Sequence, residues 1–275
     1  MRVLAQLTTT LLPALLLASC NQRDEAKDPS PAATSSAAAA PAAATMAAAV
    51  PAAARKVKEE SDLYVFDYAY PAAAAAIPAL KAWLDAHIDK ERRELVADAT
   101  ESKKGAEKEG FPYRTYSRGY DWKVVTETPG WLSLSSIVST YTGGAHPNYV
   151  FDTILWDKQA GKRRDPKDMF VSTEALAKAI QPEFCRQIDQ QRAKKRGAPV
   201  KRGSDVMFTD CLDPTPYTVI LGSSNGKAFD RVGVLVPPYE AGPYVEGAYE
   251  VTIPVTAEIL EAVKPEFRSS FVVAR

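Results

Sequence analysis

Apolar and polar residues alternate differently in three parts of the chain, and each pattern predicts a different kind of segment. An apolar run from Leu11 to Leu17 lies close to the amino terminus. Residues 21–61 then carry almost no large apolar side chain, so they have little to contribute to a core. From residue 62 onward, strand-like and helix-like patterns follow one another. We therefore expect a folded region of about 210 residues behind a short leader and a tether.

The first half of the folded region predicts one strand, one helix and then a group of strands. Residues 63–70 are rich in aromatic and branched side chains, and Pro71 ends this strand. Apolar side chains then recur near helical spacing, at Ile77, Leu80, Leu84, Ile88 and Leu95. The charged interval 89–109 favours a solvated helix face or a loop. The next predicted strands are 115–120, 122–126, 131–141 and 149–156, and they are punctuated by Gly119, Pro129-Gly130 and Gly143-Gly144.

The second half predicts another helix, a hairpin and a short final helix. Ser172 is placed to cap a helix with apolar residues at four-residue steps, namely Leu176, Ile180, Phe184 and Ile188. Asn225-Gly226 is a hairpin signal between strands at 217–221 and 229–236. A last strand at 249–253 precedes a short helix that Thr256 caps and Pro265 stops. The pattern predicts an α+β fold with mainly antiparallel sheet, two longer helices and a short C-terminal helix.

The leader has the features of a bacterial lipoprotein signal. Arg2, the apolar run and the small residues Ala18 and Ser19 precede Cys20, and residues 1–19 are too short to span a bilayer. Lipidation of Cys20 would supply a durable membrane anchor, since each buried methylene contributes about 0.8 kcal/mol. The alternative is an ordinary secretory peptide with an incidental cysteine. Asn21 is not the aspartate that retains lipoproteins in the inner membrane, so we expect a cell-envelope protein on the outer membrane, facing the periplasm.

Residues 20–61 are expected to form the lipidated cysteine and an Ala/Pro-rich tether. Alanine runs favour helix, but proline interrupts them at Pro29, Pro31, Pro41 and Pro51. An extended chain of this length would reach on the order of 120 Å, and a random coil about 35 Å. Either length lets a folded head leave the membrane surface and approach the cell wall.

Charge balance argues against nucleic acid as a partner. The chain has 34 basic and 34 acidic residues, so it carries no excess of cations to displace the counterions of a polyanion. One basic cluster lies at residues 194–196 with Lys201 and Arg202. Cations at a helix end are typical of a solvated terminus, and we favour this interpretation over a polyanion site.

The cysteines fit export to an oxidising compartment. With Cys20 lipidated, Cys185 and Cys211 remain as an even pair. A bridge between them would close a loop of 26 residues and stabilise the fold by about 3.5 kcal/mol on a chain-entropy estimate. A catalytic thiol is the less favoured interpretation, because oxidation would inactivate it.

Two loops rich in glycine, proline and tyrosine carry the candidate chemistry. The first is residues 141–149, in which two glycines precede His146 and Pro147. The second is residues 237–247, which contains Pro-Pro-Tyr-Glu-Ala-Gly-Pro-Tyr. The candidate binding residues in these loops are Tyr141, Gly143, Gly144, His146, Asn148, Tyr149, Tyr239, Glu240, Gly242 and Tyr244.

These two loops, with the order of strands and helices, resemble two known families. Residues 62–160 resemble the accessory, non-catalytic region of PdaC-type proteins, and residues 161–275 resemble the extracytoplasmic region of RsiV-type anti-sigma factors. The resemblance implies a tethered module that contacts cell-wall peptidoglycan or a wall-cleaving enzyme such as lysozyme. We expect neither an anti-sigma role nor deacetylase activity, because the sequence shows no sigma-binding segment with a spanning helix and no deacetylase domain.

An enzyme is the alternative to a binding module, with a passive structural role as a third reading. His146 with Glu240 or Glu246 could act as base and acid if the two loops meet in space. The alternative interpretation is a purely structural role, in which these three side chains form hydrogen bonds within their own loops. His87 follows Trp83 by one helical turn, which predicts a surface stack without functional weight.

Other catalytic motifs receive little support. The two histidines, His87 and His146, lack a zinc motif, so we expect no metal and no cofactor. There is no GxSxG elbow. Residues 224–227 match the letters SxxK, but Asn225-Gly226 places them at a hairpin tip.

Overall fold

The computed structural model describes residues 52–203 and 206–275. The predicted signal, the lipidation site Cys20 and residues 21–51 of the expected tether lie outside the described residues. Within the part that is described, no helix is long and apolar enough to cross a membrane. The described residues belong to one unit by their internal contacts.

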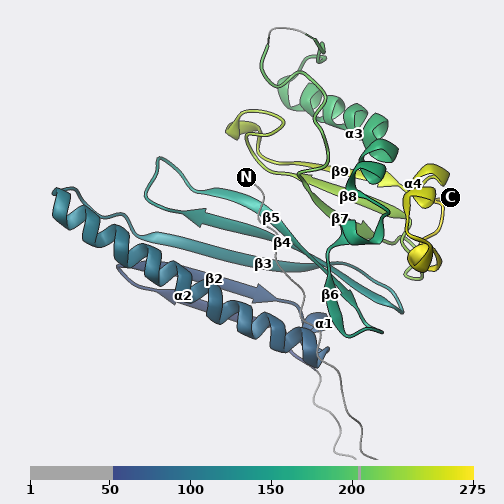
Figure 1. The fold of residues 1–275 in the computed structure, drawn as a ribbon. Helices are drawn as coiled ribbons and strands as arrows, with labels where there is room; N and C mark the ends of the chain where they lie inside the picture. The colour runs from purple at the N-terminus through teal and green to yellow at the C-terminus, as the bar shows by residue number, and fades with distance from the viewer. Residues whose placement is uncertain (1–51, 204–205) are drawn as a thin grey trace, which may run out of the picture. The chain divides into compact units, whose positions relative to one another are not determined.

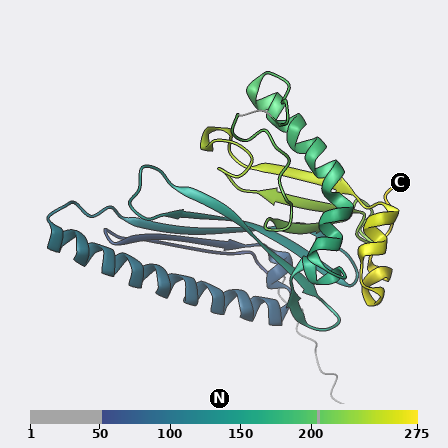
Figure 2. The same cartoon turned by 45° about the horizontal axis from the view of Figure 1, so that its top comes forward.

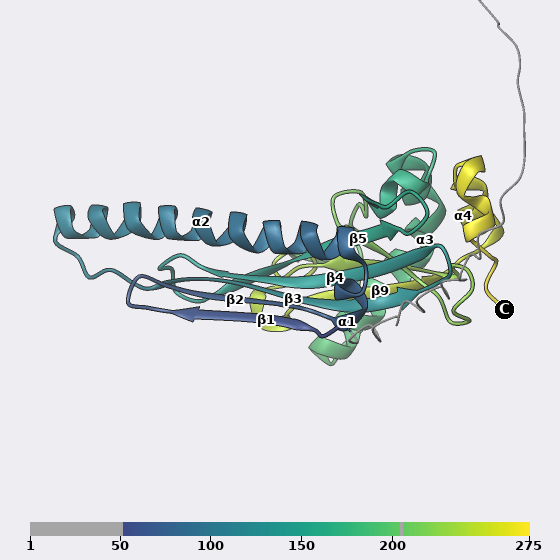
Figure 3. The same ribbon diagram turned by 90° about the horizontal axis from the view of Figure 1, so that it is seen from below.

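A six-stranded sheet runs in the order β1-β2-β3-β4-β5-β6 (Figure 1). Its strands are β1 (Arg55–Glu60), β2 (Tyr64–Tyr70), β3 (Tyr116–Glu127), β4 (Trp131–Tyr141), β5 (Asn148–Asp157) and β6 (Lys162–Arg164). Only the β2 and β3 pair is parallel. The connection between these two strands contains the short helix α1 (Ala72–Ala75) and the long helix α2 (Pro78–Glu109). Helix α2 lies along one face of the sheet (Figure 3).

A second, antiparallel sheet has three strands in the order β7-β8-β9. They are β7 (Thr218–Gly222), β8 (Arg231–Val236) and β9 (Tyr249–Pro254). Helix α3 (Thr173–Arg196) lies across this sheet (Figure 2), and α4 (Ala257–Ala262) is next to it. Three 3-10 turns complete the described part, namely η1 (Pro166–Met169), η2 (Tyr244–Glu246) and η3 (Pro265–Ser270). The predicted α+β class with two longer helices is confirmed.

Strands β4 and β5 connect the two hydrophobic cores because their side chains alternate between opposite faces. Leu132 and Ile154 pack on the α2 side, together with residues of β2 and β3. Trp131 and Leu155 point the other way and pack with α3 and the second sheet. The same two strands therefore form part of both halves of the fold.

Several elements begin or end where the sequence predicts. Ser172 caps α3, since its Oγ accepts from the Ala175 amide at 3.0 Å, and Thr256 caps α4 in the same way. Asn225-Gly226 forms the tip between β7 and β8, where Gly226 has φ +66°. In that tip the amide of Lys227 bonds the Asn225 side chain at 2.7 Å, as expected for a turn instead of a catalytic helix.

The charged interval 89–109 is part of α2, so the solvated helix face expected there is confirmed and the alternative of a loop is wrong; Ala99 and Ala106 are buried, and Gly110 ends the helix at φ +76°. Two other elements differ from the prediction. Strand β3 is continuous where two strands were expected, with an irregularity between Val124 and Thr126. Strand β1 was missed inside the expected tether, since its highly charged sequence gives no apolar alternation.

Helix α3 covers the free edge of β9 with a row of polar side chains. Gln187, Gln191 and Lys195 donate to the carbonyls of Thr252, Glu250 and Ala248 at 2.8, 2.9 and 2.7 Å. The spacings match, since four helical residues rise about 6 Å and two strand residues about 6.7 Å. The row satisfies edge carbonyls that would otherwise be open to another strand.

The expected disulfide between Cys185 and Cys211 is present. Their Cα atoms are 5.3 Å apart. The bridge ties α3 to the loop that follows it, and the nearby Gln181 side chain donates to the Leu212 carbonyl at 2.9 Å.

Candidate functional site

The two glycine-bearing loops meet in space. The first joins β4 to β5, and the second joins β8 to β9. A hydrogen bond of 2.9 Å links Nε2 of His146 to the hydroxyl of Tyr239, and the Tyr244 hydroxyl donates to the Pro147 carbonyl at 2.8 Å. The Tyr149 hydroxyl accepts from the Ala248 amide at 3.0 Å. Three contacts therefore join segments about 90 residues or more apart in the chain.

Three rings at this junction form a group that we call the aromatic platform, namely His146, Tyr239 and Tyr244. The His146 ring stacks on Tyr244 with centroids 4.0 Å apart and on Tyr239 with centroids 6.2 Å apart. The two tyrosine rings are 5.4 Å apart. Tyr239 is 48% exposed and His146 is also exposed, so the platform faces solvent. It is a rigid amphipathic surface made from two loops.

Backbone conformations that few residues adopt shape both loops. Gly143 has φ +86°, which suits glycine. Tyr239 has φ +74°, which is rare for a bulky residue and costs of order 1–3 kcal/mol. Gly242 is buried, and a Cβ there would overlap the Glu246 carboxylate. The conformation of the second loop therefore requires the Glu246 carboxylate to approach the Gly242 backbone closely.

Glu246 anchors the second loop to α3. Its carboxylate accepts two hydrogen bonds from Arg196, at 2.8 and 3.1 Å, and another from the Tyr249 hydroxyl. Burial raises the pKa of Glu246, but the hydrogen bonds from Arg196 and Tyr249 outweigh it and hold the pKa below its ordinary value. Burial and the Glu246 carboxylate raise the pKa of Tyr249 to about 12. Glu246 is thus an ionised structural group.

Two further basic residues of α3, Arg192 and Lys195, contact the same loop and the start of β9. Arg192 is fully buried, and it donates to the carbonyls of Ala241 and Asp210, each at 2.8 Å. Burial lowers the pKa of Arg192. Lys195 lies over the Tyr249 ring at 3.7 Å from its centroid. The interpretation of residues 194–196 as a solvated helix terminus missed the contacts that Lys195 and Arg196 make with the second loop. These contacts are invisible in the sequence, because only the tertiary structure brings the loop to the helix.

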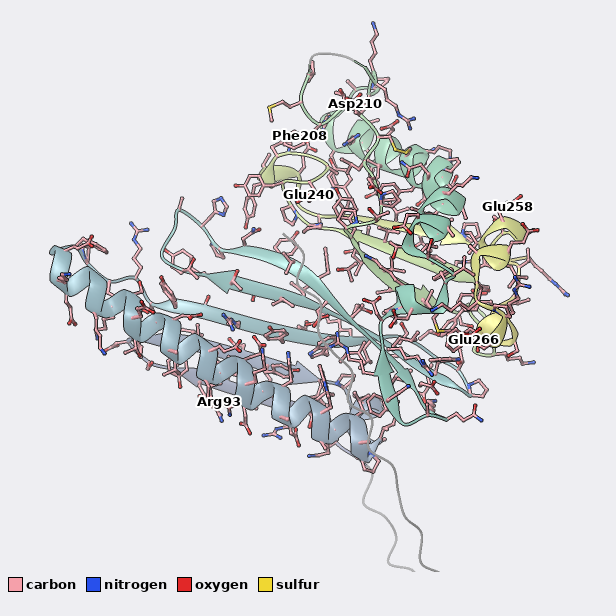
Figure 4. The ribbon with its side chains drawn as sticks, viewed as in Figure 1. Arg93, Phe208, Asp210, Glu240, Glu258 and Glu266 are labelled. Atoms are coloured by element: carbon pink, nitrogen blue, oxygen red, sulfur yellow. A yellow bond between two sulfur atoms is a disulfide. The ribbon has the colours of Figure 1, made fainter. Side chains whose placement is uncertain are left out.

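The remaining predicted binding residues support the first loop or lie beside it. The Tyr141 hydroxyl donates to the Gly144 carbonyl at 2.9 Å, and Asn148 accepts from the Tyr149 amide at 2.9 Å. Glu240 is exposed and accepts from the Tyr217 hydroxyl at 3.2 Å. It lies at the opposite end of the second sheet from Glu258 and Glu266 (Figure 4).

Two of the side chains considered as acid and base for an enzyme, His146 and Glu246, are bonded to other groups. His146 bonds Pro147 and Tyr239, whereas Glu246 bonds Arg196 and Tyr249. Among the described residues, no cluster of three histidine, cysteine or carboxylate side chains could hold a metal ion.

A buried polar network under α2 was not predicted. His87 stacks on Trp83 as expected, with ring centroids 5.0 Å apart, but its Nδ1 also bonds the Tyr68 hydroxyl at 2.9 Å. Trp122 donates to that same hydroxyl at 2.9 Å. Because Tyr68 accepts from Trp122, it can donate to a neutral His87. Polar residues spread over three elements gave no local signal for this network.

Comparisons with known proteins agree with part of the resemblance. Residues 57–149 match the protein-family model described as deacetylase PdaC, which spans most of the first sheet and α2. No curated protein matches the chain. The chain is similar to a solved structure of a DUF3298 family member from Bacteroides fragilis, with 17% identity and a TM-score of 0.46, covering 79% of this chain and 95% of that one. A DUF3298 family protein from Pseudomonas aeruginosa PAO1 has 17% identity and a TM-score of 0.45, covering 82% and 99%.

Proposed function

We propose that this protein is a membrane-tethered, extracytoplasmic binding module. Its ligand is cell-wall glycan or a wall-cleaving enzyme such as lysozyme, and the aromatic platform is the contact surface. The observation that carries the proposal is the meeting of two distant loops in one group of three neighbouring rings, in which His146 stacks on Tyr244 at 4.0 Å and Tyr239 lies 5.4 Å from Tyr244. The family match at residues 57–149 supports a PdaC-type accessory region within the same module.

The platform suits binding because its side chains are held before a ligand arrives. Tyrosine rings have few rotatable bonds, and stacking on His146 removes further freedom. Arg196 and Glu246 fix the loop that carries Tyr239 and Tyr244. Little entropy therefore remains to be lost when a ligand covers the rings.

The predicted leader and the disulfide both support a location in the cell envelope. Lipidation at Cys20 would anchor the chain at the outer membrane, and the tether would let the module reach the wall from the periplasmic side. The Cys185–Cys211 bridge is compatible with an oxidising compartment. The proposal contains no deacetylase or other catalytic activity.

The test is saturation binding of the purified protein to peptidoglycan sacculi and, separately, to lysozyme. We expect one of the two to bind, and the double variant Tyr239→Ala/Tyr244→Ala to weaken that binding by about tenfold or more, as loss of central tyrosines does. Phe111→Ala is the matched control, since Phe111 is 52% exposed but follows α2, outside both loops. Equal loss in the control variant, or no saturable binding to either material, would contradict the proposal.

A further inference from the structure

We infer that the ligand is a linear polysaccharide and that its chain continues from the aromatic platform into a second subsite between the two sheets. The inference rests on the proposed function and narrows it to one ligand class. The subsite is a pocket of about 220 Å³ lined by Asp121, Lys123, Ser135, Ser136, Ile137, Phe151, Ile220, Leu235 and Glu250. All three strands of the second sheet and β3, β4 and β5 of the first contribute to it.

The pocket lies on the sheet face that α2 leaves uncovered. Alternate residues of β4 point to that face, and at Ser135, Ile137 and Ser139 they are partly or fully exposed. Ile137 is 44% exposed, which is unusual for an isoleucine in a central strand. Gly119 on β3 keeps this face flat, because a Cβ there would meet Ser139 Oγ at 2.6 Å. The result is an open strip of small polar residues with one apolar side chain.

Tyr149 connects the strip to the aromatic platform. It lies on the same face of β5 as Phe151, and the two rings meet edge to face with centroids 5.9 Å apart. Its hydroxyl bonds Ala248, at the end of the loop that carries Tyr244. From Phe151 to Asn148, the first residue of β5, the strand advances about 10 Å. A ligand that reaches both subsites must therefore be extended.

The chemistry of the strip matches sugar rings, which have apolar faces and hydroxyl edges. Ile137 and Phe151 offer apolar contact, while the serines, Asp121 and Glu250 offer hydrogen-bond partners. The Asp121 carboxylate pairs with Lys123 at 3.0 Å, so one of the two carboxylates that line the pocket is neutralised within the lining. A pocket of this volume has room for one sugar ring of the polysaccharide. This is the size expected for one subsite in a row of subsites along an extended ligand.

The experiment compares a chitin disaccharide with a chitin hexasaccharide by calorimetry on the full chain in mild detergent. The disaccharide is expected to bind the platform alone, and the hexasaccharide to bind more tightly because it fills both subsites. Ile137→Ser should weaken hexasaccharide binding about fivefold, the effect of losing one half-buried apolar contact, and leave disaccharide binding unchanged. Tyr244→Ala should weaken both.

Val124→Ser is the matched control. Val124 is 41% exposed, but it pairs with Leu134 and so faces the α2 side of the sheet. If Tyr244→Ala weakens binding while Ile137→Ser behaves like Val124→Ser for both sugars, the second subsite is wrong and the proposed function stands. If lysozyme binds and neither sugar does, the polysaccharide inference is wrong and a protein ligand remains. Absence of binding to sugars, sacculi and lysozyme would overturn both.

Discussion

Gly242 shows how a single missing side chain sets the geometry of the site. The Glu246 carboxylate occupies the space that a Cβ at this position would need. Glu246 in turn binds Arg196 and Tyr249, so an added methyl group would displace the link between the loop and α3. Positions of this kind matter for binding although they do not touch a ligand.

We predict that Gly242→Ala lowers the free energy of unfolding by about 1–3 kcal/mol, the usual cost of overpacking a tight site. Chemical denaturation measures this change, and ligand affinity should fall with it. Gly144→Ala is the control, since a Cβ at Gly144 meets nothing within 4 Å and its φ is not positive. Equal stability of the two variants would show that the loop has room to adjust at Gly242.

His87 makes stability depend on pH. Burial lowers its pKa below the ordinary 6.5, and this outweighs the opposing effect of the Glu91 and Asp152 carboxylates. The nearby cations Lys90 and Arg163 lower it further. The unfolded chain therefore binds a proton at a higher pH than the folded chain does.

We expect the free energy of unfolding to fall as pH decreases from 6.5 toward the depressed pKa of folded His87. Below that pKa, the contribution of His87 to the pH dependence should level off. Protonation would also make Nδ1 a donor toward Tyr68, which already accepts from Trp122. Denaturation at several pH values, with the His87→Gln variant alongside, isolates the contribution. A wild-type profile that runs parallel to that of the variant would refute it.

At the scale of elements, the row of Gln187, Gln191 and Lys195 explains how α3 is fixed in register with β9. Each side chain is one helical turn from the next, and each accepting carbonyl is two strand residues from the next. Sliding α3 along the strand would break all three contacts together. The register matters for the site because the same helix carries Arg192 and Arg196 to the second loop.

Gln191→Ala should therefore destabilise the fold by about 1 kcal/mol, since it leaves the Glu250 carbonyl without this donor. Gln190→Ala is the matched control, because Gln190 is an exposed residue of the same helix. Thermal unfolding of both variants measures the difference. A loss no greater than that of the control would mean that solvent replaces the bond at no cost.

Elements with strong local signals were predictable, and those fixed by distant contacts were not. A few adjacent residues are enough to predict the helix caps at Ser172 and Thr256 and the turn at Asn225-Gly226. Strand β1 is highly charged, and its pairing with β2 is not visible in its own sequence. The charged part of α2 packs through few side chains, among them Leu95, Ala99 and Ala106. Local pattern contains no information on such partners.

The same distinction holds for the candidate site. Both loops were identified from their glycine, proline and tyrosine residues, and the sequence left open whether they meet. Their meeting depends on where the second sheet lies against β3, β4 and β5, which is a property of the whole unit. Arg192 was missed because nothing in its sequence neighbourhood distinguishes a buried arginine from a solvated one.

At the scale of the whole molecule, the two halves of the fold matter because their junction forms the binding surface. The first half supplies His146 through the β4–β5 turn, and the second supplies Tyr239 and Tyr244. Separating the halves would divide the platform. We therefore expect recognition to require both halves of the described fold in one chain.

Nuclear magnetic resonance can test most directly whether the two loops form one ligand-binding surface. Whichever of sacculus fragments or lysozyme binds would be titrated into isotopically labelled protein, and amide shifts would be followed. We predict that residues 141–149 and 237–247 shift together at the same ligand concentrations. Shifts confined to one loop, or clustered away from both, would contradict the claim that the two loops form a single recognition surface.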